Sequence, residues 1–270
     1  MPELPEVETV RRGLEIIKNK KITEIFRSNK KLRFDSTIDI EKIVNSEIID
    51  IKRKARYLIV NFSNNKTAII HLGMSGRISI KDQFIKLKHD HFAFKINNQE
   101  WLIYNDPRRF GFIDLIKTDE IENHKMLAKL GPEPLSDNFN SNYLSKILGH
   151  KTINIKTAMM DNSIVVGVGN IYINESLFDS AISPLRSCNS LKNNEIKKLV
   201  NSIKKIINEA IKLGGSSISD YQNTKGEFGY FQNLLKVYDR SNQDCYRCNG
   251  KIERIIQNGR SSFYCKSCQF

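Results

Sequence analysis

Two Cys-x-x-Cys pairs near the C-terminal end constrain this chain most strongly. Cys245 and Cys248 form the first pair, and Cys265 and Cys268 form the second. A gap of two residues lets both sulfurs of a pair reach one tetrahedral metal ion, at about 2.3 Å each. We therefore predict one structural zinc site with four thiolate ligands, with two redox dithiols as the alternative. Cys188 stands apart and is expected to be a small, partly buried apolar residue.

The tail that carries these cysteines is too short to build its own hydrophobic core. A hydrophobic core must therefore be formed by the rest of the chain. The chain has 270 residues, of which 40% are hydrophobic and 27% charged, which argues against global disorder. It contains no apolar run of about 18 residues, so we expect no transmembrane helix. The N-terminal segment has three glutamates and no apolar stretch of the kind found in secretory signals.

In the first half of the chain, the spacing of the apolar residues changes from that of a helix to that of a strand. Val7, Val10, Leu14 and Ile17 share one face of a helix predicted over residues 3–17. A series of short strands follows, which favours an antiparallel sandwich or barrel. The predicted strands are Tyr57–Phe62, Thr67–Leu72, His91–Ile96, Trp101–Tyr104 and Phe110–Ile116.

The second half returns to a helical period after a proline- and glycine-containing break at residues 131–134. One helix face is predicted over residues 143–148 and a longer one over residues 196–211, ending at Gly214-Gly215. Residues 214–230 are polar and have no clear period, so we expect a loop of the kind in which binding residues concentrate.

The charge balance favours a polyanionic partner. Lysine and arginine exceed aspartate and glutamate by 13. On a folded chain such an excess is common among nucleic-acid-binding proteins, although a merely basic enzyme has the same signature.

The N-terminus can carry nucleophilic chemistry. Removal of Met1, which a small second residue permits, would leave Pro2 with a free secondary amine. The ordinary pKa of an α-amino group, about 7.7–8.0, leaves a useful neutral fraction at physiological pH. A neutral secondary amine attacks a masked aldehyde to form an iminium ion, and Glu3 and Glu6 could move protons around it. The simpler interpretation is that these residues only make a good helix start.

Eight segments, collinear from residue 1 to residue 269, favour the nucleophilic interpretation of Pro2 over the simple helix start. They are Met1–Leu14 (MPELPEVETVRRGL), His71–Gly76 (HLGMSG), Lys88–His91 (KHDH), Asp106–Gly111 (DPRRFG), Leu130–Leu135 (LGPEPL), Met160–Asn162 (MDN), Val165–Tyr172 (VVGVGNIY) and Gly259–Gln269 (GRSSFYCKSCQ). Together they resemble the formamidopyrimidine-DNA glycosylase family, the bacterial 8-oxoguanine glycosylases with AP lyase activity.

The resemblance implies an α+β, multidomain fold. An antiparallel β-sandwich domain with a leading helix would span residues 1–130, a helix–two-turn–helix DNA-binding domain residues 131–235, and a zinc finger residues 236–270. It also implies excision of oxidised purines from damaged double-stranded DNA through a Schiff base, followed by strand cleavage. We further expect a monomer in the bacterial cytoplasm, associated with the nucleoid through DNA and with no membrane partner.

The resemblance also assigns site residues. Pro2 would be the nucleophile, Glu3 the acid of the glycosylase step, Glu6 a supporting carboxylate, and Arg260 an aid to the second elimination. The remaining assigned residues contact DNA, with the first three filling the gap left by an extruded nucleotide: Met74, Arg108, Phe110, His89, Lys151, Lys156 and Asn170. His89 and His91, two apart, would share a strand face, and a metal pair is the alternative to a phosphate-facing His89.

One position departs from the family pattern. Arg56 stands where the family has a lysine assigned to elimination or to the lesion phosphate. Arginine binds phosphate well but is a poor proton donor. Lys54, expected on the same strand face, is a possible substitute.

Two other functions remain open. An endonuclease VIII-like glycosylase would share Pro2, Glu3 and the architecture but prefer oxidised pyrimidines; Leu4 and the Met74, Arg108 and Phe110 set favour purines. A non-catalytic DNA-binding zinc protein would not cross-link to a lesion duplex in borohydride.

Overall fold

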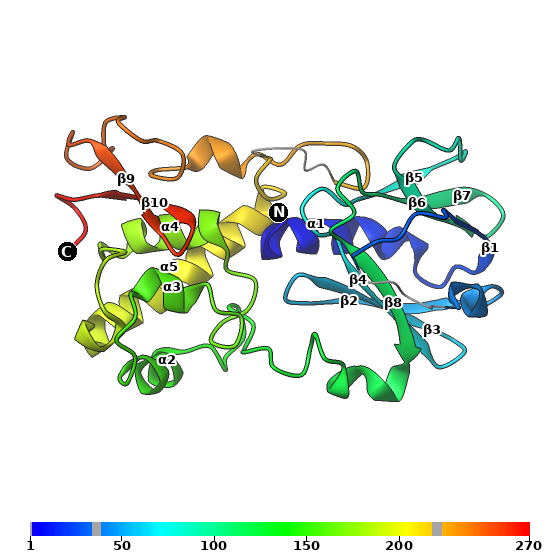
Figure 1. Ribbon diagram of the computed structural model, residues 1–270, viewed down its shortest axis with the longest axis horizontal. Coiled ribbons are helices and arrows are strands. Elements are labelled where there is room, and N and C mark those ends of the chain that lie inside the picture. The colour runs from blue at the N-terminus through cyan, green and yellow to red at the C-terminus, as the bar shows by residue number, and fades with distance from the viewer. Residues whose placement is uncertain (1, 34–38, 218–222) are drawn as a thin grey trace. The chain divides into compact units, whose positions relative to one another are not determined.

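Short strands with alternating apolar residues form two antiparallel sheets in the first half of the chain. The computed structural model describes residues 2–33, 39–217 and 223–270 (Figure 1). The strands are β1 (Ile22–Arg27), β2 (Ile48–Lys54), β3 (Tyr57–Phe62), β4 (Lys66–His71), β5 (Arg77–Lys81), β6 (Asp90–Ile96), β7 (Glu100–Asn105) and β8 (Phe112–Lys117). The sheets have the strand orders β1-β6-β7-β5 and β2-β3-β4-β8.

One apolar core lies between these sheets. Ile22 and Phe94 of the first sheet pack in a single cluster with Val60 and Ile70 of the second, and helix α1 (Leu4–Leu14) adds Val10. Burial of apolar side chains from two facing sheets is what holds a sandwich together. The predicted N-terminal antiparallel β-sandwich is confirmed.

Each predicted strand corresponds to a strand of the structure, with ends that differ by no more than two residues. β3 has the predicted bounds, whereas the start of the strand predicted over Phe110–Ile116 is wrong, because β8 begins at Phe112. Phe110 follows Arg109, which adopts a positive φ of 57° and breaks the extended backbone. Strands β1, β2 and β5 were not predicted from the sequence, and the burial of β1 does not alternate regularly.

The second half of the chain is helical. Helix α5 (Asn193–Lys212) is strongly amphipathic, which is why its period is visible in the sequence. Helix α4 (Asn170–Asp179) is buried on every side and therefore shows no amphipathic period, and α3 (Ile155–Met159) is too short to show one. The helices are α2 (Ser141–Leu148), α3 (Ile155–Met159), α4 (Asn170–Asp179) and α5 (Asn193–Lys212), and the described 3-10 helices are η1 (Glu15–Ile17), η2 (Ile40–Ile43), η3 (Thr118–Asn123), η4 (Cys188–Ser190) and η5 (Phe231–Leu234).

The C-terminal tail is attached to α4 by polar contacts along the helix. The Glu175 carboxylate accepts hydrogen bonds of 2.8–3.0 Å from the backbone N–H groups of residues 236–238. Asn174 Oδ1 accepts from the N–H of Phe263 at 2.8 Å. Arg247 donates to the carbonyl oxygen of Phe178 at 2.6 Å. The hairpin of β9 (Ile252–Gln257) and β10 (Arg260–Cys265) therefore has a defined place on the helical part of the chain.

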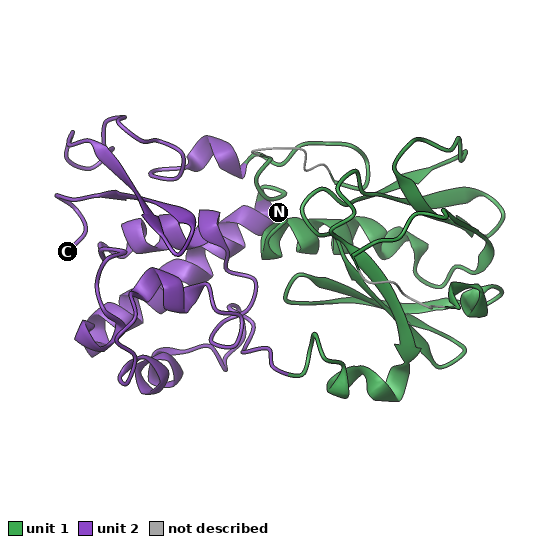
Figure 2. Cartoon of the chain, viewed as in Figure 1, with its two compact units in different colours: residues 1–128, 213–230 green, residues 129–212, 231–270 purple. Residues whose placement is uncertain are grey.

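The structure divides into two compact units (Figure 2). The first contains residues 1–128 and 213–230, and the second contains residues 129–212 and 231–270. The chain thus returns to the first unit after α5 before it forms the cysteine-bearing tail. The division into three domains at 130/131 and 235/236 stays a prediction. No helix in the described part of the chain is long and apolar enough to span a membrane.

Candidate functional site

The N-terminal turn places two buried carboxylates next to Pro2. Pro2 is itself buried, and Glu3 and Glu6 have exposed fractions of 6% and 2%. Glu3 is the N-cap of α1, and Glu6 Oε2 accepts a hydrogen bond from the Glu3 N–H at 2.7 Å. This is one half of a capping box, which satisfies a backbone donor that the helix leaves open. Met1 lies outside the described residues.

A contact across more than 200 residues completes this turn. Glu6 Oε1 accepts a hydrogen bond from the backbone N–H of Ser216 at 2.7 Å. Gly215 has a φ of +81°, and a Cβ there would lie 2.8 Å from Glu6 Oε1. Only glycine tolerates both conditions easily. Sequence reasoning interpreted Gly214-Gly215 as a helix stop and missed Ser216, because no local pattern reports a contact at that separation.

The turn between β2 and β3 carries the departure from the family pattern. β2 ends at Lys54, and Ala55 has a positive φ of 56°, so Arg56 lies in the turn. The expectation that Lys54 and Arg56 share a strand face is wrong. Lys54 instead lies 3.7 Å from Glu122 in an ion pair.

Glu8 organises the cationic residues beside this turn. Its carboxylate lies 3.2 Å from Nε of Arg53 and 3.0 Å from Nε of Arg12. Burial raises the pKa of Glu8, but the hydrogen bond from Arg12 and the charges of Arg11 and Arg53 outweigh burial and lower the pKa overall. Glu8 is therefore ionised at neutral pH.

Two neighbouring loops present the predicted wedge residues. Met74 and Phe110 are each 42% exposed, which is high for large apolar side chains. The Arg108 guanidinium carbon lies 4.8 Å from the centre of the Phe110 ring. A Cβ on Gly73 would lie only 2.4 Å from the carbonyl carbon of Phe110, so the loops are in direct contact. The structure brings these three predicted residues to one place.

The two histidines of the KHDH segment do not share a strand face, so that expectation is wrong. β6 begins at Asp90, which leaves His89 in the preceding turn. His91 is buried, with Nδ1 3.1 Å from Ser28 Oγ and Nε2 3.0 Å from the Asp106 carbonyl oxygen. Because both ring nitrogens of His91 are engaged, a metal pair with His89 is not supported. Burial lowers the pKa of His91, so its ring is neutral at neutral pH.

Another histidine supports the Met74 loop. His71 Nδ1 accepts a hydrogen bond from the Gly73 N–H at 3.1 Å, and its ring stacks on Phe112. Burial, together with the nearby charges of Arg56 and Arg33, lowers the pKa of His71 to about 4. The neutral ring is therefore a stable acceptor for the loop.

In the second unit, two predicted DNA-contacting residues hold the β9–β10 hairpin. Lys156, 1% exposed, donates from Nζ to the Ser261 carbonyl oxygen and to Ser262 Oγ, both at 2.7 Å. Asn170, the first residue of α4, donates to the same Ser261 oxygen at 3.1 Å. Both side chains thus fix the residue next to Arg260. Lys151, also predicted to bind DNA, lies in the turn after α2.

Arg260 lies just beyond a tight turn. Asn258 and Gly259 have φ values of +48° and +72°, as the Asn-Gly pair predicts. Arg260 is exposed and borders a depression of about 160 Å³ that Lys156, Met160 and Asp161 also line.

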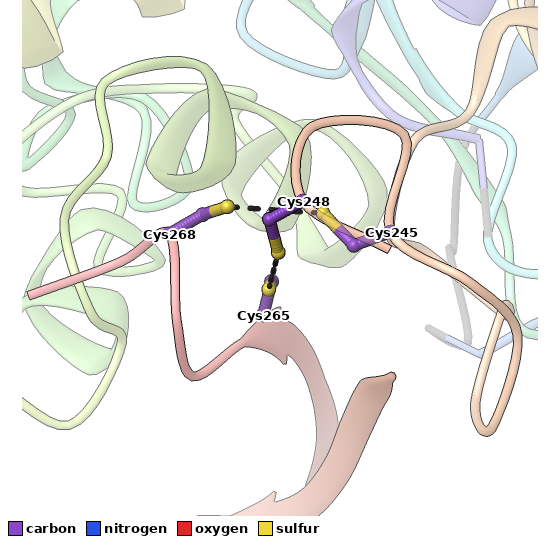
Figure 3. A group of neighbouring side chains, drawn as sticks. All are labelled: Cys245, Cys248, Cys265 and Cys268. Carbon is purple, nitrogen blue, oxygen red and sulfur yellow. Dashed lines mark hydrogen bonds between the residues drawn. The ribbon is translucent and has the colours of Figure 1, made fainter. Parts of the chain in front are cut away.

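The four cysteines of the tail converge (Figure 3). All four sulfur atoms lie within 4.8 Å of one another, with Cys245–Cys268 at 3.9 Å and Cys248–Cys265 at 3.5 Å. Sulfurs at the corners of a tetrahedron with metal bonds of about 2.3 Å are about 3.8 Å apart. A disulfide would need about 2.05 Å. The geometry fits one metal ion with four thiolate ligands.

The thiols of this cluster have different electrostatic environments. The Gly250 N–H, followed by the neighbouring cysteines, lowers the pKa of Cys248 to about 7, whereas burial, followed by the neighbouring cysteines, raises the pKa of Cys265 and of Cys268. Cys188, outside the cluster, is buried and its pKa is raised to about 11, as expected for an inert thiol.

Comparison with family models identifies both halves of the chain. Residues 1–113 match the formamidopyrimidine-DNA glycosylase N-terminal domain, and residues 130–222 match the H2TH domain of the same enzymes. The chain is 44% identical to formamidopyrimidine-DNA glycosylase from Rickettsia bellii over 277 residues, which cover 100% of this chain and 99% of that protein. It is also 44% identical to the Wolbachia pipientis enzyme over 272 residues, covering 100% of both.

Solved structures give the same result. A Lactococcus lactis Fpg in complex with DNA containing an abasic site matches with a TM-score of 0.91 at 36% identity, covering 99% of each chain. A structure of MutM in complex with DNA containing carbocyclic 8-oxo-G matches with a TM-score of 0.90 at 36% identity and the same coverage.

Proposed function

The chain belongs to the formamidopyrimidine-DNA glycosylase family, and on this premise we propose that it is a DNA repair glycosylase with AP lyase activity. Its substrates would be oxidised purines, 8-oxoguanine and formamidopyrimidines, in duplex DNA. The observation that carries the proposal is the buried N-terminal turn, in which Glu6 accepts from the N–H groups of Glu3 and Ser216. Such anchoring holds Pro2 and Glu3 in one geometry, as a covalent catalyst requires.

The Pro2 nitrogen would attack C1′ of the damaged nucleoside. The bond from C1′ to the base breaks, and the base leaves with a proton that Glu3 is placed to supply. The sugar ring opens and an iminium ion forms between Pro2 and C1′. Loss of a C2′ proton then expels the 3′-phosphate, and a second elimination expels the 5′-phosphate. Water hydrolyses the remaining linkage and returns the free amine.

Access to C1′ requires the nucleotide to leave the base stack. We infer that Met74, Arg108 and Phe110 fill the space that it leaves, because two apolar side chains and a planar cation suit stacking between bases. The exposure of Met74 and Phe110 and the contact between Arg108 and Phe110 support this role. Arg56, His89, Lys151 and Asn170 are proposed phosphate ligands. Lys156, being buried, would act on DNA through the hairpin that it holds.

Arg260 would bind a phosphate beside the lesion. Arginine keeps its proton at all physiological pH values, so its contribution is charge and position. The same reasoning assigns Arg56 to phosphate binding and leaves proton transfer in the eliminations to Glu3, Lys54 or water.

We propose zinc as the metal of the four-cysteine cluster. When bound, it would link the two cysteine pairs and stabilise the fold of the tail. We further propose that the protein acts as a monomer on damaged duplex DNA in the bacterial cytoplasm.

Borohydride trapping tests the proposed function. The protein is incubated with two duplexes, one containing 8-oxoguanine and one containing an oxidised pyrimidine. We expect covalent trapping, much faster on the 8-oxoguanine duplex. Preferential trapping on the pyrimidine duplex would indicate an endonuclease VIII-like enzyme, and binding without trapping on either would indicate a non-catalytic DNA-binding protein.

A further inference from the structure

A buried carboxylate lies beneath the two loops that carry Met74, Arg108 and Phe110. Asp106 has an exposed fraction of 0%. Its Oδ1 accepts a hydrogen bond from Ser75 Oγ at 2.6 Å, and its Oδ2 accepts from the Gly111 N–H at 2.8 Å. Burial of a carboxylate is costly unless hydrogen bonds satisfy it. These contacts therefore strongly constrain the positions of Ser75 and Gly111.

The contacts of Asp106 reach both ends of the loop that holds Arg108 and Phe110. Ser75 Oγ, while donating to Asp106, accepts from the Arg108 N–H at 3.1 Å. Gly111, bound directly to the carboxylate, follows Phe110 in the chain. The backbone is therefore pinned at Arg108 and again immediately after Phe110, and the intervening Arg109 is held in its positive φ by an N–H bond to the Asp106 carbonyl oxygen.

The same contacts reach the second loop. Ser75 is 7% exposed and follows Met74 directly, so the hydroxyl that binds Asp106 also fixes the backbone beside Met74. The backbone N–H of Asp106 donates to the carbonyl oxygen of His89 at 3.0 Å, which ties a proposed phosphate ligand to the same centre.

Rigidity at this place matters for opening a duplex. Unstacking a base step costs a few kcal/mol, and side chains that push into the stack must not fold back when they meet this resistance. Exposed apolar side chains on a flexible loop would collapse onto the protein. A loop held by buried charge-assisted hydrogen bonds meets the DNA already in its bound shape.

We propose that Asp106 and Ser75 are positioning residues for duplex opening: they hold Met74, Arg108 and Phe110 in the conformation that enters the base stack. The inference rests on the proposed function. It assigns these two residues to nucleotide extrusion and not to bond cleavage.

The test compares a paired lesion with the same lesion unpaired. Single-turnover excision is measured on 8-oxoguanine opposite cytosine and on 8-oxoguanine opposite an abasic tetrahydrofuran residue. Ser75→Ala should slow excision of the paired lesion about tenfold, the size expected for one lost buried hydrogen-bonding group. Excision of the unpaired lesion should fall about twofold or less, because extrusion costs least there. Asp106→Asn should show the same selectivity.

Ser28→Ala is the matched control. It removes a hydroxyl from the far side of His91, which also contacts Asp106, without touching either loop. This variant should excise both lesions at the unsubstituted rate. Equal losses on the two duplexes, or no loss on the paired duplex, for Ser75→Ala would overturn the inference.

A second measurement reports unstacking on binding and does not require base excision. 2-Aminopurine placed beside an 8-oxoguanine that is paired with cytosine should brighten on protein binding, before the base is released, as its stacking is disrupted, and Ser75→Ala should reduce the signal at saturation. Unchanged brightening would overturn the inference even if excision were slowed. A native protein that brightens the probe but excises neither lesion would instead refute the proposed function alone.

Discussion

Arg108 and Arg260 are both exposed and are both proposed to touch DNA, yet the chain holds them by different means. Arg108 lies on a loop of the sandwich, where a large apolar core supplies stability and one buried carboxylate specifies loop shape. Arg260 lies on a hairpin whose local apolar cluster is small and consists partly of cysteines. The hairpin depends on its four thiolates and on side chains from α3 and α4.

The difference shows what each region requires. In a unit with a large core, hydrogen bonds need only select one loop conformation. A short tail gains little from apolar burial, so the proposed metal ion would have to contribute to its folding. Disrupting the cysteine cluster should therefore unfold the C-terminal tail. Disrupting the contacts of Asp106 should only make the loops that carry Met74, Arg108 and Phe110 more mobile.

The largest expected effect follows from removing a thiolate. Cys245→Ser should release the metal and lower DNA affinity on the order of 100-fold, while the thermal transition of the sandwich unit stays unchanged. Metal analysis, a DNA titration and calorimetry of the same sample measure the three quantities. Cys188→Ala is the control, because this buried thiol lies outside the cluster. If DNA affinity were retained after complete loss of the metal, the claim that the hairpin depends on its four thiolates would be wrong.

Two lysines of the second unit separate support from phosphate binding. Lys156→Met removes the donor to Ser262 Oγ and one of the two donors to the Ser261 carbonyl oxygen, and should lower the free energy of unfolding of the second unit by about 1–3 kcal/mol. Lys151→Ala should leave stability unchanged but shallow the slope of log K against log salt by roughly one unit. Both variants are compared by denaturation and by binding at several salt concentrations. If Lys151→Ala lowered stability and Lys156→Met changed only the salt dependence, Lys151 would be the supporting residue and Lys156 the phosphate ligand.

His71 should make the stability of the sandwich depend on pH. Its pKa is about 4 in the folded state and 6.5 ordinarily, so the unfolded chain takes up a proton below pH 6.5 that the folded chain refuses. The free energy of unfolding therefore falls between pH 6.5 and 4, on the order of 2–3 kcal/mol from this group, and does not depend on it above pH 6.5. His71→Asn keeps an acceptor for Gly73 and should flatten this part of the curve; an unchanged slope would assign it to other groups.

The smallest effect is expected at Arg56. Arg56→Lys should leave base excision within about twofold, because the proposed chemistry of base loss uses Pro2 and Glu3, while strand nicking is unchanged or faster because lysine can transfer a proton. Separate assays of base release and nicking on one lesion duplex distinguish these steps. Loss of base excision would place Arg56 in the first step.

The sequence predicted what short-range patterns encode. The amphipathic face of α5, the alternation in β3 and the spacing of the cysteines each correspond to a feature of the structure. The sequence shows no helical period over α4, because a helix buried on all sides has no alternation of apolar and polar faces. Nor did it reveal the bond between Ser216 and Glu6 or the role of Asp106, since these depend on contacts between distant segments.

The central claim is that the Pro2 amine is the nucleophile, and peptide mapping of the borohydride-trapped complex tests it most directly. The complex formed on an 8-oxoguanine duplex is digested and the modified peptide identified by mass spectrometry. We expect the DNA adduct on the nitrogen of Pro2 in protein that has lost Met1, and no adduct in protein that retains it. An adduct on Lys54 or on any other lysine, or efficient trapping of protein that retains Met1, would contradict the account.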